Sequence, residues 1–231
     1  MSEQGASPLA ERIARRAAPR LLAASANVTL PARLHAAASR MVGRRGRLEL
    51  FFAFDDPCSA VAVLDLLDRT ATRQLDVVLL AVVRRGMAGD PAVEQKRAYG
   101  LLDAQRLARR RAARPLGRTR PLAPSDTAFL AEWVAGAPQG PALTAFCRAT
   151  LERLWLTDDS SVAASELLGL WREHLGREPR RDGGALRRNE ARMARRGPYE
   201  TPAAWVAGRW YFAQDRPTQI CEWLDELGWT A

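Results

Sequence analysis

The sequence predicts an α/β fold that opens with a strand–helix–strand unit, continues through a run of helices and closes with a hairpin and a last helix. Two nearly continuous apolar runs, residues 48–54 and 75–83, have the length and composition of buried strands. The amphipathic segment between them is long enough for a parallel crossover, which places both strands in one sheet. Longer amphipathic segments between residues 91 and 196 indicate an all-helical middle.

Bulk composition limits the classes of protein that fit this chain. It has 231 residues, 47% of them hydrophobic, which is enough for one sizeable core. The net charge of +9 comes almost wholly from arginine, since Lys96 is the only lysine, and such usage is typical of a GC-rich bacterial genome. A basic surface attracts nucleic acid, acidic lipids or anionic substrates. The chain has no zinc-ligand spacing, RNA-reading aromatic pattern or recognition helix, so nucleic-acid binding is not expected.

Location and redox class follow from what the sequence lacks. No segment reaches the ~20 apolar residues of a membrane span, and the N-terminus lacks the apolar region of a signal peptide. We therefore expect a cytoplasmic protein. Cys58, Cys147 and Cys221 lie far apart and form no CxxC pair, which argues against a disulfide framework and a dithiol redox pair. No metal site is predicted.

The N-terminal lead-in is rich in arginine and alanine. Apolar residues recur at helical spacing between Leu9 and Leu21, although Pro19 interrupts them, and a second helix is expected over about 31–42, ending at Gly43. One interpretation is a membrane-surface or partner-binding helix. The other is a helical extension that packs on the domain, or a frayed arm, and the narrow aliphatic stripe favours it.

The first strand breaks directly into a helix. Asp56 has the position of its N-cap and Pro57 that of its first residue, while Asp55 is expected to be a solvated turn residue. The buried stripe of this helix is expected to contain Val61, Leu64 and Leu67.

The middle of the chain begins with a helix over about 91–113 whose basic end is expected to be solvated, followed by a Pro-rich linker over 115–124. Three amphipathic helices come next, the third starting after caps at 158–161, and a basic fourth helix covers about 184–196. Cys147 falls on an apolar stripe and is expected in the core. The apolar positions that mark the three amphipathic helices are Phe129, Leu130, Trp133 and Val134; Leu143, Phe146, Leu151 and Leu154; and Leu167, Leu168, Trp171 and Leu175.

The closing segment contains a strand over 203–207, a turn at Gly208, a partner strand over 210–212 and a helix over about 217–227. The last helix is expected to bury Ile220, Cys221, Leu224 and Leu227. The whole order is that of a thioredoxin topology with a helical insertion. We divide the chain into a basic helical extension (1–46), a thioredoxin-like domain (47–90 and 197–231) and a helical insertion (91–196).

Three segments resemble the DsbA-like branch of the thioredoxin superfamily, nearest to 2-hydroxychromene-2-carboxylate isomerases and kappa-class glutathione transferases. The strand and turn FFAFDDPCSAVAVL is similar to the family's strand plus (S/C)PxxxL turn. The helix KRAYGLLDAQRLARR resembles the family's pattern of Lys, Tyr, Asp and Arg, and GPYETPAAWVAGRWYFAQDR resembles its closing GxxGxPxxxxxGxxxxGQDR segment. The resemblance covers about residues 47–228 and implies the DsbA-like fold.

The departures from the family bear on the reaction. The family has a reacting Ser or Cys before the turn proline, where this chain has Asp56, and Ser59 aligns with the second redox Cys, which excludes dithiol exchange. By resemblance the bond between Thr201 and Pro202 is expected to be cis, beside the turn, with backbone groups open to a bound thiol. Glu200 replaces a family glycine before this bond. Ala203 replaces a family threonine after it.

Two turn residues carry open alternatives. Asp56 is either a helix cap, which would lower its pKa and make it a poor general base, or a catalytic carboxylate. Cys58 lies in the first helical turn, where the helix dipole favours a thiolate and two adjacent carboxylates oppose it. It is either a monothiol nucleophile or an ordinary pocket or core residue.

Further positions come from the resemblance. Gln214 and Asp215 match residues that hold the γ-glutamyl end of glutathione in the relatives, although Asp215 also has the position of a cap for the last helix. The candidate catalytic residues are Asp56, Cys58 and Ser59, and the candidate ligand-binding residues are Asp55, Pro57, Thr201, Pro202, Gln214 and Asp215. A scaffold network is expected for Lys96, Tyr99, Asp103 and Arg106.

The resemblance implies a glutathione- or thiol-dependent isomerase or transferase that acts on a small aromatic or polyketide-like molecule. The objection is electrostatic, because a thiolate ~4 Å from an ionised Asp56 is disfavoured by about 4 kcal/mol at an effective dielectric constant near 20. Two alternatives are a catalytically silent ligand- or partner-binding module and a monothiol redox protein that uses Cys58. A homodimer is left open.

Overall fold

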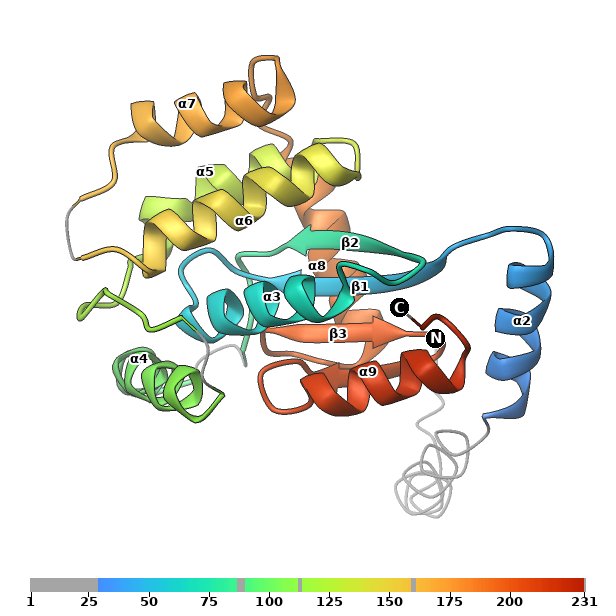
Figure 1. The fold of residues 1–231 in the computed structure, drawn as a ribbon. Coiled ribbons are helices and arrows are strands. Elements are labelled where there is room, and N and C mark those ends of the chain that lie inside the picture. The colour runs from blue at the N-terminus through green and yellow to red at the C-terminus, as the bar shows by residue number, and fades with distance from the viewer. Residues whose placement is uncertain (1–28, 87–89, 112–113, 159–160, 231) are drawn as a thin grey trace, which may run out of the picture.

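The structure is a computed structural model that describes residues 29–86, 90–111, 114–158 and 161–230 (Figure 1). The helix expected between Leu9 and Leu21 lies outside the described residues. Among the described residues, no helix is long and apolar enough to cross a membrane.

A mixed sheet of four strands forms the centre of the domain, in the order β2-β1-β3-β4. β1 (Gly46–Phe52) runs parallel to β2 (Leu75–Ala81), while β3 (Ala203–Val206) is antiparallel to both β1 and β4 (Arg209–Phe212). This arrangement confirms the predicted strand–helix–strand unit and the closing hairpin. β3 stops one residue early because Ala207 (φ 44°) and Gly208 (φ 92°) make the turn.

The first two strands both end two residues before the predicted positions. Asp56 N–H donates to the Ala53 carbonyl at 3.2 Å, so the chain already turns at Ala53 and Phe54 cannot extend the ladder. β1 instead begins two residues earlier than predicted, at Gly46. The strand that leads to the turn is therefore shorter at the end that faces the candidate site.

Helices cover both faces of the sheet (Figure 1). α3 (Pro57–Thr70) and α9 (Pro217–Glu226) lie on one face, over the side chains of Leu48, Leu50 and Phe52. α8 (Gly183–Arg196) lies on the other, where Met193 packs with Phe51. The stripe predicted for α3 is buried as expected: Val61, Leu64 and Leu67. In the stripe predicted for the last helix, Cys221 is a correction, because it is only partly buried while Ile220, Leu224 and Leu227 are buried.

Besides α8, the predicted insertion contains α4 (Val93–Arg110), which packs on α3, and α5 (Pro124–Ala135), α6 (Pro141–Trp155) and α7 (Ala164–Leu175). The ring of Trp171 meets the rings of Trp133 and Phe146 edge-on, which locks the three helices together. Cys147 is fully buried, as predicted. The predicted caps of α7 are wrong, since its N-cap is Ala163 and carries no side-chain hydrogen bond.

α2 (Leu30–Met41) agrees with the second predicted N-terminal helix and ends before Gly43, whose φ is +70°. It stands at the edge of the domain (Figure 1), where Arg33 pairs with Glu226 at 2.6 Å. The division of the chain at residues 47, 91 and 197 stays a prediction.

One buried hydrogen bond joins the insertion to the turn after β1. Trp155 Nε1 donates to the Phe54 carbonyl at 2.9 Å, and both residues are buried. We predict that Trp155→Phe lowers the free energy of unfolding by about 1–3 kcal/mol more than Trp171→Phe does, because it leaves the Phe54 carbonyl unpaired. Trp171 is the matched control, since its buried Nε1 has no partner among the described residues. Urea unfolding of both variants measures the difference, and equal losses would contradict the prediction.

Candidate functional site

Three connecting segments meet at the carboxyl end of β1. They are the turn Ala53–Asp56, the loop after β2 and the loop that precedes β3. The Thr201–Pro202 bond is cis, as predicted, and both residues are buried. Pro57 is buried at the start of α3, in the predicted position. The expected turn and the expected proline loop are therefore neighbours in space.

The Asp56 carboxylate is the point at which two of these segments are joined. Its Oδ1 accepts from the Cys58 N–H at 3.1 Å, which confirms the predicted N-cap. Its Oδ2 accepts from Ser59 Oγ at 2.6 Å and from Thr201 Oγ1 at 2.8 Å. Ser59 is fully buried and also accepts from the Ala53 N–H at 3.2 Å. Ser59 therefore positions Asp56 and is closed to a ligand.

The surroundings of Asp56 oppose its ionisation. Burial raises the pKa of this carboxyl, while Arg85 and the hydroxyls of Ser59 and Thr201 act in the opposite direction and Asp55 adds repulsion. Part of the residue's surface still reaches solvent even though its carboxyl is densely enclosed. The expected lowering of the Asp56 pKa by capping is therefore wrong, because desolvation outweighs the hydrogen bonds.

Asp55 is a second correction, because it is buried rather than solvated. Only 7% of the residue is exposed, and its two oxygens accept from Arg85 at 2.8 and 2.9 Å. Such a two-point pair satisfies both groups. Arg85 comes from the loop after β2, so this pair fastens the third segment to the turn. Sequence reasoning missed Arg85, although its place directly after a buried strand is a usual place for functional residues.

Glu200 adds another carboxylate to the same site. It lies beside Gly86, where an added Cβ would come within 3.3 Å of its Oε1, and the Gly86 N–H donates to the Tyr199 carbonyl at 2.6 Å. Burial raises the pKa of Glu200, while Arg85 and Lys96 lower it. Arg85 forms its ion pair with Asp55, and among the described residues no cation forms an ion pair with Asp56 or Glu200. A shared excess of negative charge favours protonation here.

Cys58 points away from this cluster. Its S–H lies 3.8 Å from the Gly100 carbonyl of α4, and its side chain packs against a small cluster around Val61 and Ala104. Burial raises the pKa of the thiol, and the Asp56 carboxylate raises it further. The predicted support of a thiolate by the helix dipole is therefore outweighed.

Gln214 and Asp215 lie on the Cys58 side of the site. The Gln214 carbonyl accepts from Arg111, which also pairs with Asp65 at 3.5 Å. The basic residues at the end of α4 were predicted to be solvated, and Arg111 is a correction because it is held by these two partners. The side-chain Oε1 of Gln214 is buried without a partner among the described residues. Asp215 is exposed and acts electrostatically on Cys58. The capping alternative for Asp215 is wrong, since the N-cap of α9 is Arg216.

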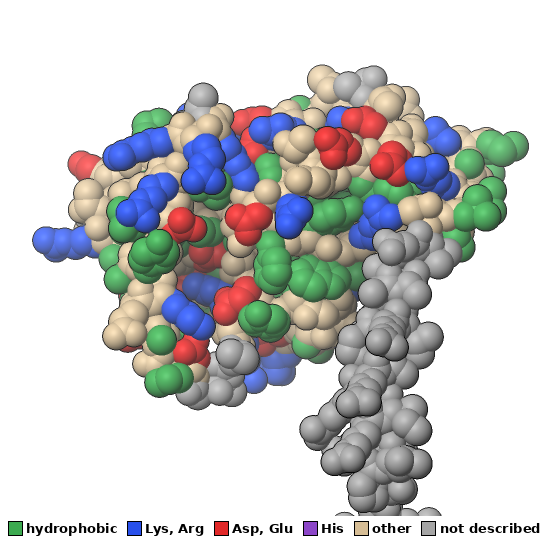
Figure 2. Space-filling view, turned by 90° about the horizontal axis from the view of Figure 1, so that it is seen from below, with side chains coloured by type: hydrophobic (Ala, Val, Ile, Leu, Met, Phe, Trp, Pro, Cys, Tyr) green, Lys and Arg blue, Asp and Glu red, His purple; other side chains and the backbone are tan. Residues whose placement is uncertain are grey.

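The α4 residues predicted as one network form separate contacts. Lys96 pairs with Asp90, and Arg106 donates to Tyr99 Oη at 3.3 Å while lying over its ring. In the described part of the chain, no group of His, Cys, Asp or Glu is arranged to hold a metal ion. Figure 2 shows basic and acidic side chains interspersed on the face below the sheet, without one continuous basic patch there.

Comparison with known proteins supports the fold. The chain is similar to the structure of a 2-hydroxychromene-2-carboxylate isomerase, with 17% identity, a TM-score of 0.58 and coverage of 79% of this chain and 96% of that one. It is also similar to a probable DsbA oxidoreductase from Streptomyces coelicolor, with 16% identity, a TM-score of 0.56 and coverage of 81% and 92%. No protein-family model and no curated protein sequence matches it. The chain therefore has the DsbA-like variant of the thioredoxin fold.

The raised pKa of Asp56 predicts a pH-dependent stability. A carboxyl whose folded pKa lies above its ordinary value of 3.8 contributes stability below that value, and this stability is lost as pH rises through the folded pKa. We predict that Asp56→Asn gains stability relative to the natural chain as pH rises from about 4 to about 8. Urea unfolding at several pH values measures this difference. A difference that is constant, or that moves the other way, would contradict it.

The environment of Cys58 predicts slow alkylation. Cys221 is partly buried and has Arg73 and Arg69 nearby, so we expect iodoacetamide to label it before Cys58, with Cys147 last. Mass spectrometry of samples labelled below neutral pH gives the order. Rapid labelling of Cys58 would show that its thiol is activated.

Proposed function

We propose that this DsbA-like thioredoxin-fold protein is an isomerase or transferase that uses glutathione or another small thiol and acts on a small aromatic or polyketide-like molecule. The observation that carries the proposal is the Asp56 carboxyl, which occupies the reacting position of the resembling family and is bonded by Thr201 across the site. A thiolate is an effective nucleophile that adds reversibly to conjugated double bonds, which suits isomerisation.

The charges of the site support a protonated partner for the thiol. Asp55 is neutralised by Arg85, whereas Asp56 is desolvated, and burial raises its pKa. A neutral Asp56 donates a hydrogen bond to a thiolate, as a serine hydroxyl does. The carboxyl and the thiol then share one proton, and the repulsion of about 4 kcal/mol between two anions arises only when that proton leaves.

The same arrangement suggests roles for neighbouring residues. Bound thiol would lie beside Thr201 and Pro202, with its sulfur toward Asp56. Asp215 is exposed on the Cys58 side, where its carboxylate is free to accept from the ammonium of a γ-glutamyl group. Gln214 would offer its unpartnered Oε1 to a donor of the ligand.

A second candidate is a catalytically silent ligand-binding module. It is favoured by the internal bonding of the turn, because Asp55 is held by Arg85 and both oxygens of Asp56 already accept hydrogen bonds. The monothiol redox alternative is disfavoured, since burial raises the pKa of Cys58 and its sulfur faces Gly100.

Glutathione titration tests the proposal. We predict that glutathione binds at low salt and that its affinity falls at least about tenfold between about pH 6 and about pH 9, as the shared proton is lost. Asp56→Asn keeps a donor and cannot ionise, so it should flatten this fall. Isothermal titration calorimetry measures both profiles.

S-methylglutathione is the matched ligand control, because it has no thiol proton to share and should bind with little pH dependence. Absence of glutathione binding at every pH would sink the proposal. Binding whose pH profile is unchanged by Asp56→Asn would leave Asp56 as a helix cap only.

A further inference from the structure

Side chains form hydrogen bonds with many of the outward backbone groups at the β2 edge of the sheet. β2 is an edge strand, and the parallel pairing directs its even-numbered residues to β1, in phase with Val82 just after the strand, whose N–H donates to the Phe52 carbonyl at 2.9 Å. The odd-numbered residues therefore direct their N–H and C=O groups outward. Leu79 shows this directly, because its N–H and C=O both bond to the side-chain amide of Gln139, at 2.9 and 3.0 Å.

Other polar side chains bond to several of the remaining outward groups of this edge. Such protection is how proteins keep an edge strand from pairing with another chain. The outward groups and their partners are the Leu75 carbonyl with Arg45, the Ala81 carbonyl with Asn189 and the Val83 N–H with Glu190.

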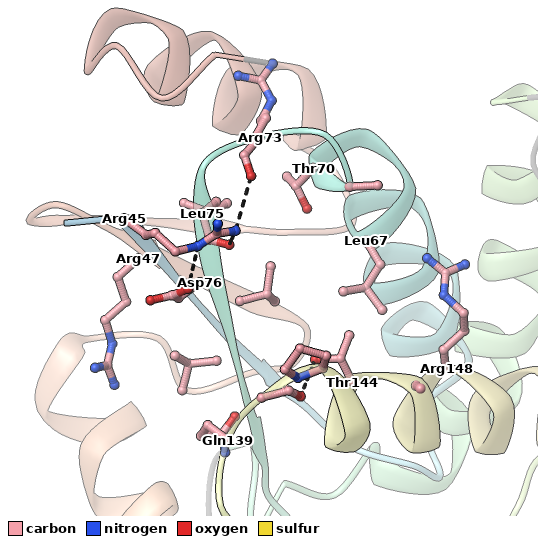
Figure 3. A pocket seen from close by; sticks show the side chains of 16 residues that line it. Arg45, Arg47, Leu67, Thr70, Arg73, Leu75, Asp76, Gln139, Thr144 and Arg148 are labelled. Carbon is pink, nitrogen blue, oxygen red and sulfur yellow. Dashed lines mark hydrogen bonds and ion pairs between the residues drawn. The ribbon is translucent and has the colours of Figure 1, made fainter. Parts of the chain in front are cut away.

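In the described part of the chain the Ala81 N–H also lacks a partner, but Val77 is the odd-numbered residue of β2 at which both outward groups do. Its outward N–H and C=O have no partner among the described residues, and Val77 lines a cavity of about 840 Å³. Figure 3 shows this groove between β2, the end of α3 and the start of α6. Leu67, Leu75 and Ala145 give it apolar surface. The groove thus combines a vacant amide position with room for an apolar side chain.

The rim of the groove is basic. Arg45, Arg47 and Arg148 line it, whereas Asp76 is the one carboxylate among its described lining residues and is paired with Arg45 at 2.8 Å. Arg148 is held by Asp68 through a single guanidinium nitrogen at 2.7 Å, which leaves further donors open. Arg73 also lines the groove, but its guanidinium is turned away in Figure 3.

We propose that this groove binds an N-acylated apolar amino acid. Its amide N–H would donate to the Val77 carbonyl while one of its carboxylate oxygens accepts from the Val77 N–H, as a residue of a neighbouring strand would. Its apolar side chain would contact Leu67 and Leu75, and its other carboxylate oxygen would face Arg45, which lies beside Leu75 at the same edge.

This site is separate from the thiol site. It lies at the C-terminal end of α3, and Asp56 caps the other end of that helix of 14 residues, about 20 Å away. The two sites share no residue, so the binding of glutathione and the binding of a ligand in the groove are testable separately.

Calorimetry with N-acetyl-leucine on the full chain tests the proposal. We predict binding that weakens about tenfold for its methyl ester, which lacks the carboxylate. Val77→Pro removes the outward N–H but no hydrogen bond to β1, and should weaken binding about fivefold or more. Val77→Ala is the matched control, since it keeps the N–H and should bind within about twofold.

Two further variants test the groove without a proline, in case Val77→Pro does not fold. Ala145→Phe fills the groove and should abolish binding, whereas Ala142→Phe on the exposed side of the same helix should not. Equal affinity of acid and ester, or unchanged affinity after Ala145→Phe, would overturn the proposal. Binding of longer peptides that end in leucine, without binding of N-acetyl-leucine, would overturn the assignment to a small ligand.

Discussion

The enclosure of one carboxyl group, Asp56, is the constraint on which the rest of the site depends. A helix that starts directly after a buried strand leaves N–H groups inside the protein, and Asp56 satisfies that of Cys58. The same carboxyl accepts from Ser59 and from Thr201. Removing it would leave buried donors on two segments, so the position of the proline loop relative to the turn follows from this one group.

The insertion and the neighbouring loops add to this constraint. Trp155 reaches the Phe54 carbonyl from α6, and Arg85 reaches Asp55 from the loop after β2. Each contact brings protein atoms closer to the turn and removes water from it. Burial is the largest cause of the raised Asp56 pKa, and Arg85 acts against it.

The features that depend on a local sequence pattern were predicted correctly. Asp56 as a cap, Pro57 at the start of α3 and the closing hairpin follow from spacing and turn chemistry, and the fold follows from their order. Solvation was not predictable in this way. Asp55 appears in the sequence as a turn residue, and only the tertiary position of Arg85 makes it a buried ion partner. The predicted lowering of the Asp56 pKa was wrong for the same reason. A capping pattern indicates the hydrogen bonds that lower the pKa but not the burial that outweighs them.

The capping and catalytic interpretations of Asp56 are physically compatible. A neutral carboxyl retains a carbonyl oxygen, and Oδ2 is well placed to be that oxygen, because it accepts from both hydroxyls. The proton then resides on Oδ1, whose remaining lone pair still faces the Cys58 N–H. In the proposed complex, the O–H on Oδ1 would be the donor to the bound thiol. Protonation thus preserves the cap and creates a donor, which a permanently ionised aspartate at this position would lack.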